Sequence, residues 1–191
     1  EVTRSKGYEN LDFIRSADDM VILVHWHPKE DWILQKVQKR HKEELDKLEV
    51  EMNLEKTKVV DLKKGGSFSF LGFDFRFTRN REGKAYVSKT PRKKKCIEIG
   101  KRVRAVLKAN WNKPRKEVIQ AVNAIIRGWV NYFRIGNSNS AFSKVRDYLE
   151  MKVRKFVLRR KKLKGFGWKR WSREEIYGKL GLYNDYRIRY V

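Results

Sequence analysis

The uneven distribution of charge is the strongest constraint on this 191-residue chain. Residues 1–90 contain 18 Lys and Arg against 16 Asp and Glu, whereas residues 91–191 contain 29 against 7, so the net charges are +2 and +22. Repulsion among so many cations penalises a compact fold unless an anionic partner binds there. The sequence therefore predicts two parts that divide at Pro91, with nucleic acid as the first candidate partner of the second. A solvated basic surface is the alternative.

Composition excludes several other classes of protein. The chain is 40% hydrophobic and 13% aromatic, which is typical of a folded protein. It has no apolar run of about 18 residues that could span a bilayer, and its N-terminus lacks the pattern of a signal peptide. We therefore expect a cytoplasmic protein without a membrane partner. The single Cys96 excludes an internal disulfide and a Cys-x-x-Cys zinc site.

Two short apolar runs near the N-terminus flank a pair of aspartates. Residues 13–16 and 20–24 have the composition of strands, and Ala17-Asp18-Asp19 stands between them. The pattern predicts a β-hairpin with both carboxylates at or beside its turn.

A helix and further strands are predicted before the basic part. Apolar residues recur at helical spacing from Asp31 to Met52, with His41 at the edge of the apolar stripe. Residues 58–62 predict a strand, and residues 67–77 another. The phenylalanines of the latter change parity around Gly72, which predicts a β-bulge. Such a glycine marks close approach of a backbone or ligand, or a purely structural kink.

Beyond Pro91 the periodicity becomes helical. Helices are predicted over residues 94–108, from Pro114 to Phe133, and from about Ser140 through Phe156, followed by a tail rich in Gly, Trp and Arg from Lys164 onward. Together they predict a three-helix bundle. The expected fold class is α+β.

The Asp18-Asp19 pair suggests a metal site. Adjacent ionised carboxylates repel each other unless a cation that prefers oxygen ligands binds them, and Mg²⁺ meets that requirement. In two-metal phosphoryl transfer such carboxylates hold the ions that activate the attacking hydroxyl and stabilise the leaving oxygen. An ordinary acidic turn is the other reading.

Motifs along the chain resemble those of group II intron-encoded reverse transcriptases and maturases. The Asp-Asp hairpin, the long helix, Leu54-Glu55-Lys56-Thr57 and Phe70-Leu71-Gly72-Phe73 follow the order of a reverse transcriptase palm. Four later segments resemble parts of the maturase-specific domain. They are Ile126-Arg127-Gly128-Trp129-Val130-Asn131-Tyr132-Phe133, Leu158-Arg159-Arg160, Gly165-Phe166-Gly167-Trp168-Lys169-Arg170-Trp171 and Leu180-Gly181-Leu182. The resemblance covers nearly the whole chain.

This resemblance implies a role for each part. Residues 1–90 would be the C-terminal part of a palm, built of antiparallel hairpins and one long helix, and residues 91–191 the α-helical maturase-specific thumb. Asp18 and Asp19 would be catalytic ligands of Mg²⁺, while Phe70, Leu71 and Gly72 would grip the primer end. Lys56 would lie near the nucleotide or template backbone. The thumb would hold intron RNA for splicing and template–primer duplex for DNA synthesis.

Three departures from the family pattern affect the expected activity. Ser16 stands where the family usually has an aromatic residue before Ala-Asp-Asp. The fingers and first palm strand, with another metal-binding aspartate, would lie upstream of Glu1, so we expect this chain alone to lack polymerase activity and to need that segment as a partner. No zinc-type nuclease domain is expected.

Residues 152–170 have the composition of an RNA-binding segment. They contain ten Lys and Arg among nineteen residues, interleaved with Phe156, Phe166 and Trp168, which suits phosphate neutralisation and stacking on unpaired bases. A solvated helix face with packed tryptophans is the alternative. The predicted nucleic-acid-binding residues are Lys56, Arg127, Arg134, Arg159, Arg160, Lys161, Lys162, Lys164, Trp168, Lys169 and Arg170.

Two histidines form a weaker candidate site. His25-Trp26-His27 places two imidazoles on one side of a strand end, where they could bind a metal. Since no third ligand is in view, surface histidines are the other reading.

Three functions remain open. The first is a maturase and reverse transcriptase fragment, and the second is a non-catalytic RNA-binding module with vestigial aspartates. The third is the reverse transcriptase part of another system, such as a retroelement-derived defence protein. Ser16 and the missing palm segment favour the second for this chain as given.

Overall fold

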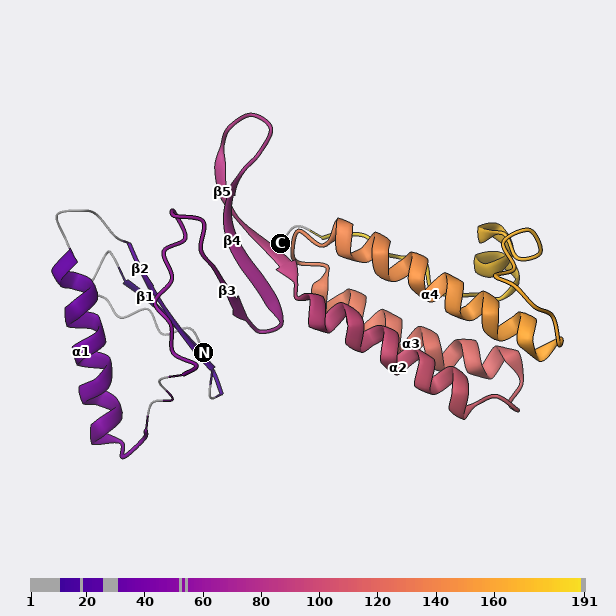
Figure 1. Ribbon diagram of the computed structural model, residues 1–191, viewed down its shortest axis with the longest axis horizontal. Helices are drawn as coiled ribbons and strands as arrows, with labels where there is room; N and C mark the ends of the chain where they lie inside the picture. The colour runs from indigo at the N-terminus through magenta and orange to yellow at the C-terminus, as the bar shows by residue number, and fades with distance from the viewer. Residues whose placement is uncertain (1–10, 18, 26–30, 52, 54, 190–191) are drawn as a thin grey trace. The chain divides into compact units, whose positions relative to one another are not determined.

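The computed structural model describes residues 11–17, 19–25, 31–51, 53 and 55–189 (Figure 1). The chain divides into two compact units, Glu1–Lys64 (unit 1) and Gly65–Val191 (unit 2). Small antiparallel sheets and helices occur together, and the C-terminal region is helical, as an α+β chain requires. The division into palm and thumb at residues 90 and 91 concerns function and stays a prediction.

The hairpin predicted in unit 1 is formed. Strand β1 (Leu11–Ser16) pairs antiparallel with β2 (Asp19–Val24), from Leu11 opposite Val24 to Ser16 opposite Asp19. Ala17 begins the connection with a φ of 52°, and the Arg15 Nε donates a hydrogen bond to its carbonyl oxygen at 3.0 Å.

Helix α1 (Asp31–Lys47) is shorter than the sequence pattern predicts. Its end is closed by a turn in which the Leu48 and Val50 amides donate to the Leu45 carbonyl, while Glu49 takes a left-handed φ of 54°. This arrangement satisfies carbonyls at a helix end, so the prediction that the helix reaches Met52 was wrong; Met52 itself lies outside the described residues. The strand predicted over residues 58–62 does not form, because these residues pair with no other described segment.

Unit 2 begins with a three-stranded antiparallel sheet. Strands β3 (Ser67–Phe70), β4 (Phe73–Arg79) and β5 (Ala85–Pro91) pair in that order. The predicted bulge at Gly72 was wrong: Phe70 pairs with Phe73, so Leu71 and Gly72 form a two-residue hairpin turn with φ of 48° and 78°. Positive φ at both turn positions is the geometry that suits tight hairpins, and it explains the change of parity.

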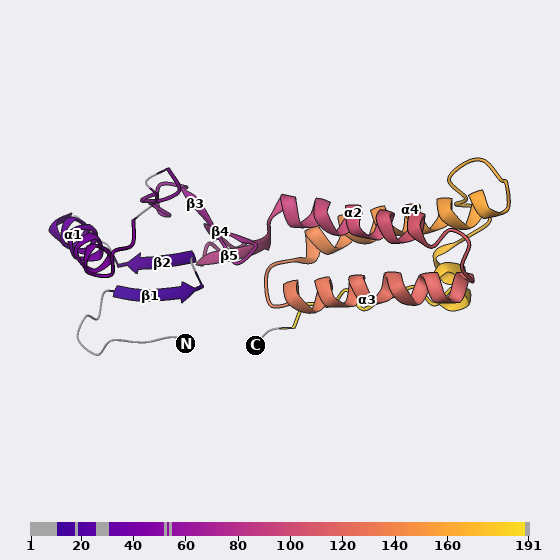
Figure 2. The same cartoon turned by 90° about the horizontal axis from the view of Figure 1, so that it is seen from below.

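The predicted three-helix bundle forms the rest of unit 2. Its helices are α2 (Lys93–Ala109), α3 (Arg115–Phe133) and α4 (Asn139–Arg160), and both views show them side by side (Figures 1 and 2). The apolar positions predicted to face inward are buried or pack against the buried core, which includes Ile99, Val103, Leu107, Val118, Val122, Ile126, Phe133, Phe142, Val145, Leu149, Val153 and Phe156. None of the described helices is long and apolar enough to cross a membrane.

The β3–β4–β5 sheet is joined to the bundle by at least three contacts. Phe73 is 4% exposed and packs edge-on against Phe133, with ring centroids 4.9 Å apart. The Tyr132 hydroxyl donates to the Leu71 carbonyl at 2.8 Å, and the Arg92 amide donates to the Gly72 carbonyl at 2.9 Å. The sheet therefore belongs to the unit of the helices.

The C-terminal tail runs back along α3. A short π-helical turn, η2 (Glu175–Lys179), comes first. Asn123 then holds the chain by donating to the Gly181 carbonyl at 2.7 Å and accepting from the Tyr183 amide at 2.8 Å. Further on, the Arg189 amide donates to the Arg134 carbonyl near the end of α3.

Candidate nucleic-acid interface

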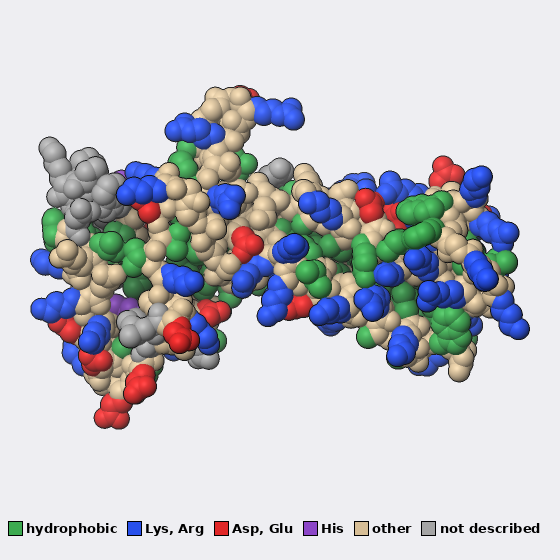
Figure 3. Space-filling view, viewed as in Figure 1, with side chains coloured by type: hydrophobic (Ala, Val, Ile, Leu, Met, Phe, Trp, Pro, Cys, Tyr) green, Lys and Arg blue, Asp and Glu red, His purple; other side chains and the backbone are tan. Residues whose placement is uncertain are grey.

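The cations of the chain are concentrated on unit 2. Residues 65–191 contain 34 Lys and Arg against 9 Asp and Glu, a net charge of +25, whereas residues 1–64 carry 13 against 14, a net charge of −1. Basic side chains stand over much of the helical face seen in Figure 3, with few acidic ones among them. Such a surface attracts polyanions.

The densest cations lie on a segment that follows α4, residues 161–171, which we call the basic loop. Lys161, Lys162, Lys164, Lys169 and Arg170 are all exposed. The loop leaves the helix through a turn in which the Leu163 amide donates to the Leu158 carbonyl at 3.0 Å. The cations are therefore held in solvent at a fixed helix end.

The glycines of the basic loop place its backbone against α4. Gly165 and Gly167 have φ of 98° and 77°, which side chains disfavour. A Cβ at Gly167 would lie 2.5 Å from a Leu158 methyl group, so the backbone approaches the helix more closely than another residue allows. The residue between the two glycines, Phe166, remains 50% exposed.

Two aromatic rings of the loop are each covered by a cation from α4. The Lys155 ammonium lies 4.0 Å from the centroid of the Phe166 ring, and the Arg154 guanidinium lies 4.1 Å from that of Trp168. Trp168 is 53% exposed. Cation–π contacts of this kind hold an aromatic ring in place without burying both of its faces.

A buried ionic network ties the loop and η2 to α4. Glu150 is 0% exposed and accepts hydrogen bonds from Arg154 at 3.2 Å, from Arg173 at 3.1 Å and from the Tyr177 hydroxyl at 2.5 Å. Arg154, 1% exposed, also donates to the Trp171 carbonyl at 2.8 Å. Burial, and then the hydrogen bond to Glu150, raises the pKa of Tyr177 far above its ordinary value. The hydrogen bond to Glu150 likewise raises the pKa of Arg173.

Part of unit 2 matches the model of a known protein family. Residues 98–177, from α2 into η2, match the model of the group II intron maturase-specific domain. Unit 2 thus contains a region similar to the maturase domains of group II introns, and we call residues 98–177 the maturase domain. This confirms the resemblance found in the sequence, and it supports a maturase role in group II intron splicing. No curated protein compared with the chain matches it.

Most predicted RNA-binding residues of the maturase domain are exposed near the basic loop. Arg159 is exposed at the end of α4. Arg160 is half-buried, and its guanidinium donates to the Lys113 carbonyl at 2.7 Å. Arg127 is exposed on α3, with its guanidinium 5.9 Å from the centroid of the Tyr183 ring.

Arg134 is a correction to the predicted interface. Its side chain is 8% exposed and bonds to the Tyr183 hydroxyl at 3.2 Å and to the Asp185 carboxylate at 3.2 Å. The guanidinium therefore holds the C-terminal tail to α3. Its charge is not part of the exposed basic surface.

The residues predicted for polymerase chemistry fall in both units. In unit 1, Asp19 is exposed at the start of β2, Lys56 is exposed in a turn closed by Asn53, and Asp18 lies outside the described residues. In unit 2, Phe70, Leu71 and Gly72 form the end of the β3–β4 hairpin.

The two predicted metal sites lie partly outside the described residues. No group of three or more His, Cys, Asp and Glu side chains that could hold a metal occurs within the described part of the chain. His27 and Asp18 lie outside that part, so the predicted His25–His27 and Asp18–Asp19 sites stay predictions. His41 is half-buried on α1, as expected for the edge of an apolar stripe.

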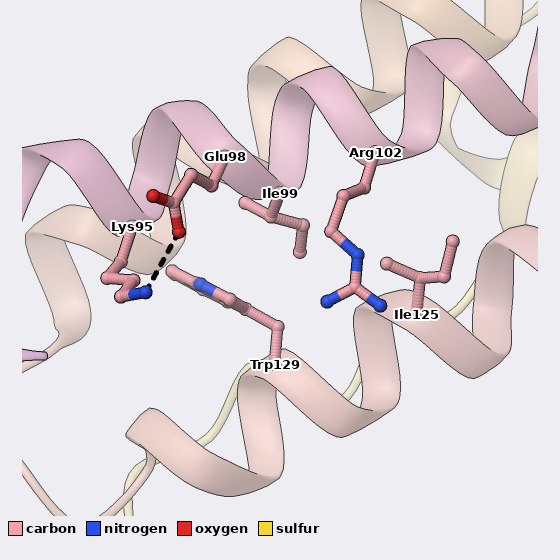
Figure 4. Close-up of a pocket in the computed structure, with 6 residues that line it drawn as sticks. All are labelled: Lys95, Glu98, Ile99, Arg102, Ile125 and Trp129. Carbon is pink, nitrogen blue, oxygen red and sulfur yellow. Dashed lines mark hydrogen bonds and ion pairs between the residues drawn. The ribbon is translucent and has the colours of Figure 1, made fainter. Parts of the chain in front are cut away.

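Unit 2 has a hollow between α2 and α3. It is lined by Lys95, Glu98, Ile99, Arg102, Ile125 and Trp129 (Figure 4). Lys95 donates to Glu98 at 3.0 Å, and this hydrogen bond lowers the pKa of the Glu98 carboxyl group. Trp129 extends from α3 toward this ion pair, and its buried indole nitrogen has no hydrogen-bond partner among the described residues.

Sequence reasoning missed the residues that hold the interface in place. Glu150 is the single acidic residue between Asp147 and Arg173, and it stands four residues from both Arg146 and Arg154. That spacing places the three side chains on one helix face and could have signalled an ion pair. The partners Arg173 and Tyr177 are 23 and 27 residues away in sequence, and no local pattern indicates them.

Proposed function

We propose that the maturase domain binds folded group II intron RNA through the basic loop and the adjoining end of α4, and thereby assists splicing. The supporting observation is the segment 151–173, which contains eleven Lys and Arg and no Asp or Glu. It includes a buried anchor, Arg154, while Arg159 and the cations of the basic loop stay in solvent.

The physical basis of this binding is counterion release. Each phosphate that a lysine or arginine neutralises frees a condensed cation, so affinity falls steeply as salt rises. A basic loop held to α4 by Arg154 loses less conformational freedom on binding than a mobile tail would. The proposed interface therefore combines charge with preorganisation.

The test is a titration of intron RNA with the chain at increasing salt concentrations. We expect tight binding in dilute salt, with a logarithm of affinity that decreases linearly with the logarithm of salt concentration. Replacing both Asp18 and Asp19 with Ala should leave this affinity unchanged, because the acids lie in the other unit. Absence of RNA binding in dilute salt, or its loss in the double variant, would contradict the proposal.

A second function is proposed for the intact protein, RNA-templated DNA synthesis. The observation that favours it is the hairpin register, in which Ser16 pairs with Asp19 and places Asp19 at an exposed hairpin end, with Asp18 next to it in sequence. Carboxylate oxygens are ligands that Mg²⁺ prefers, so Asp18 and Asp19 suit this ion by donor type. Bound Mg²⁺ would supply positive charge to stabilise the transferring phosphoryl group.

This second function needs partners that supply the rest of the site. An upstream reverse transcriptase segment would contribute a further carboxylate, and a template–primer duplex would lie against the thumb. Primer extension with that segment present should require Mg²⁺ and be abolished by Asp18→Ala. If the wild type instead synthesises no DNA while Asp18→Ala still assists splicing, that result would favour the non-catalytic RNA-binding module.

A further inference from the structure

The exposed ring of Phe166 stands at the edge of a small hollow. The hollow is lined by Lys155, Arg159, Leu163, Lys164, Gly165 and Phe166. One apolar side chain, Leu163, and one aromatic ring are thus surrounded by three cations. A site of this composition suits a flat apolar group that carries negative charge on either side.

The orientation of Phe166 is set by its backbone and by Lys155. Left-handed backbone at the glycines on both sides makes a sharp bend, and Gly167 is held against Leu158. The Lys155 ammonium sits 4.0 Å from the ring centroid, yet half of the residue remains exposed. A ring that is fixed and still open is a stacking platform, since it loses little freedom when a second ring covers it.

An RNA duplex does not offer the matching surface. Its bases are stacked on each other, and its deep major groove excludes side chains, so an aromatic ring meets base faces only where nucleotides are unpaired. The surrounding cations Lys155, Arg159 and Lys164 exclude cationic partners and attract phosphates. Charge and shape together favour an unpaired nucleotide as the occupant.

We propose that Phe166 stacks on an unpaired nucleobase of the bound RNA, with Lys155, Arg159 and Lys164 neutralising the phosphates that flank it. This inference rests on the proposed RNA-binding function and adds the kind of RNA that the site selects. The maturase domain therefore binds a bulged or looped nucleotide at the basic loop, in addition to the nonspecific charge of the helical surface.

The test compares two RNA probes with the full chain. One is a short RNA duplex with a single bulged 2-aminopurine, and the other is the same duplex without the bulge. We expect the wild type to bind the bulged probe more tightly and to change its fluorescence through stacking. Phe166→Ala should weaken binding of the bulged probe by about five- to a hundred-fold, and it should leave binding of the plain duplex unchanged.

Two further variants separate stacking from folding. Phe166→Trp should restore affinity for the bulged probe, because the larger ring offers the same platform. Tyr86→Ala removes an aromatic side chain that is 40% exposed on β5 and should change neither probe's affinity. Equal losses on both probes, or unchanged affinity for the bulged probe in Phe166→Ala, would overturn the inference while the salt-dependent RNA binding of the wild type still stands. Failure of the wild type to bind either probe in dilute salt would instead reject the proposed function itself.

Discussion

The two units of this chain differ in net charge and in how far their apolar side chains are buried. None of the described residues of unit 1 is fully buried, and its apolar side chains include Trp32 at 54%, Leu48 at 67% and Val59 at 61% exposure. Its near-neutral charge is arranged in surface ion pairs between neighbours on the chain, such as Arg40 with Glu44. Unit 2 has a continuous buried core and a net charge of +25.

The contrast lies in the core, which unit 2 has and which offsets the repulsion of its dense like charge. In unit 2 the helices bury enough apolar surface to offset repulsion among exposed cations. Unit 1 exposes apolar side chains that a further protein segment could cover, which agrees with its prediction as part of a larger palm. Unit 2 has a core of its own, and the assignment of unit 1 to a palm stays a prediction.

The largest effect expected from a single substitution is on the buried network of unit 2. Glu150→Gln leaves the buried Arg154 without a carboxylate, and breaking a buried pair in this way costs about 3–5 kcal/mol. The free energy of unfolding, measured by urea denaturation, should fall by that amount. Arg40→Ala, which removes an exposed ion pair of α1, should leave stability close to that of the wild type. Equal effects of the two substitutions would erase the contrast between the units.

Removal of equal charge from each unit is expected to separate their contributions to RNA binding. Replacing Lys161, Lys162 and Lys164 together with Ala should weaken RNA binding by roughly ten- to a thousand-fold and lower the salt slope by about 2–3. The matched control replaces Lys36, Lys39 and Lys42 of α1, which are also exposed. Its affinity and slope should stay near those of the wild type. A comparable loss in the control would show that RNA contacts both units.

The helices of unit 2 were predictable because their cores repeat at helical spacing. Ile99, Val103 and Leu107 define the buried face of α2 without any knowledge of its neighbours, and the structure places all three in the core. The β1–β2 hairpin was predictable for a similar local reason. Periodicity therefore identified the elements whose burial follows from their own sequence.

The misread elements depend on turn geometry and on distant partners. The turn at Leu71 and Gly72 was taken for a bulge, because leucine hides the Asn-Gly or Gly-Gly signal that usually marks a tight hairpin. Strand β5 was not predicted, because it forms through its pairing with β4 and its own sequence does not indicate it. Arg134 was assigned to RNA because charge alone does not reveal that Asp185, 51 residues away, binds it.

A smaller effect is expected at Tyr177, the hydroxyl that donates to Glu150. Burial and this hydrogen bond raise the pKa of Tyr177 in the folded state above its unfolded value of about 10. The neutral hydroxyl therefore contributes stability below that pH, and the contribution is lost as pH rises further. Tyr177→Phe should lower the free energy of unfolding by about 1.5 kcal/mol near neutral pH. Above a pH of about 10, the free energy of unfolding of this variant should decline less steeply than that of the wild type.

Urea denaturation at closely spaced alkaline pH values measures this difference. Tyr186, whose pKa is also raised by burial, stays in both proteins and provides the shared background. Parallel pH profiles for the two proteins would show that Tyr177 titrates in the same way in the folded and unfolded chain.

The smallest expected effect concerns two hairpin turns, the β1–β2 turn of unit 1 and the β3–β4 turn of unit 2. Leu71 in unit 2, like Ala17 in unit 1, takes a left-handed φ that costs an ordinary side chain about 1–2 kcal/mol. Asparagine tolerates this conformation, and Leu71 is 43% exposed, so Leu71→Asn should raise the free energy of unfolding by up to about 1 kcal/mol. The hydrogen bond from Tyr132 reaches the backbone carbonyl and is unaffected. If urea denaturation instead shows a loss of stability, the leucine side chain packs usefully despite its exposure. If stability rises while primer extension by the intact protein falls, leucine at this position serves the primer end and not the fold.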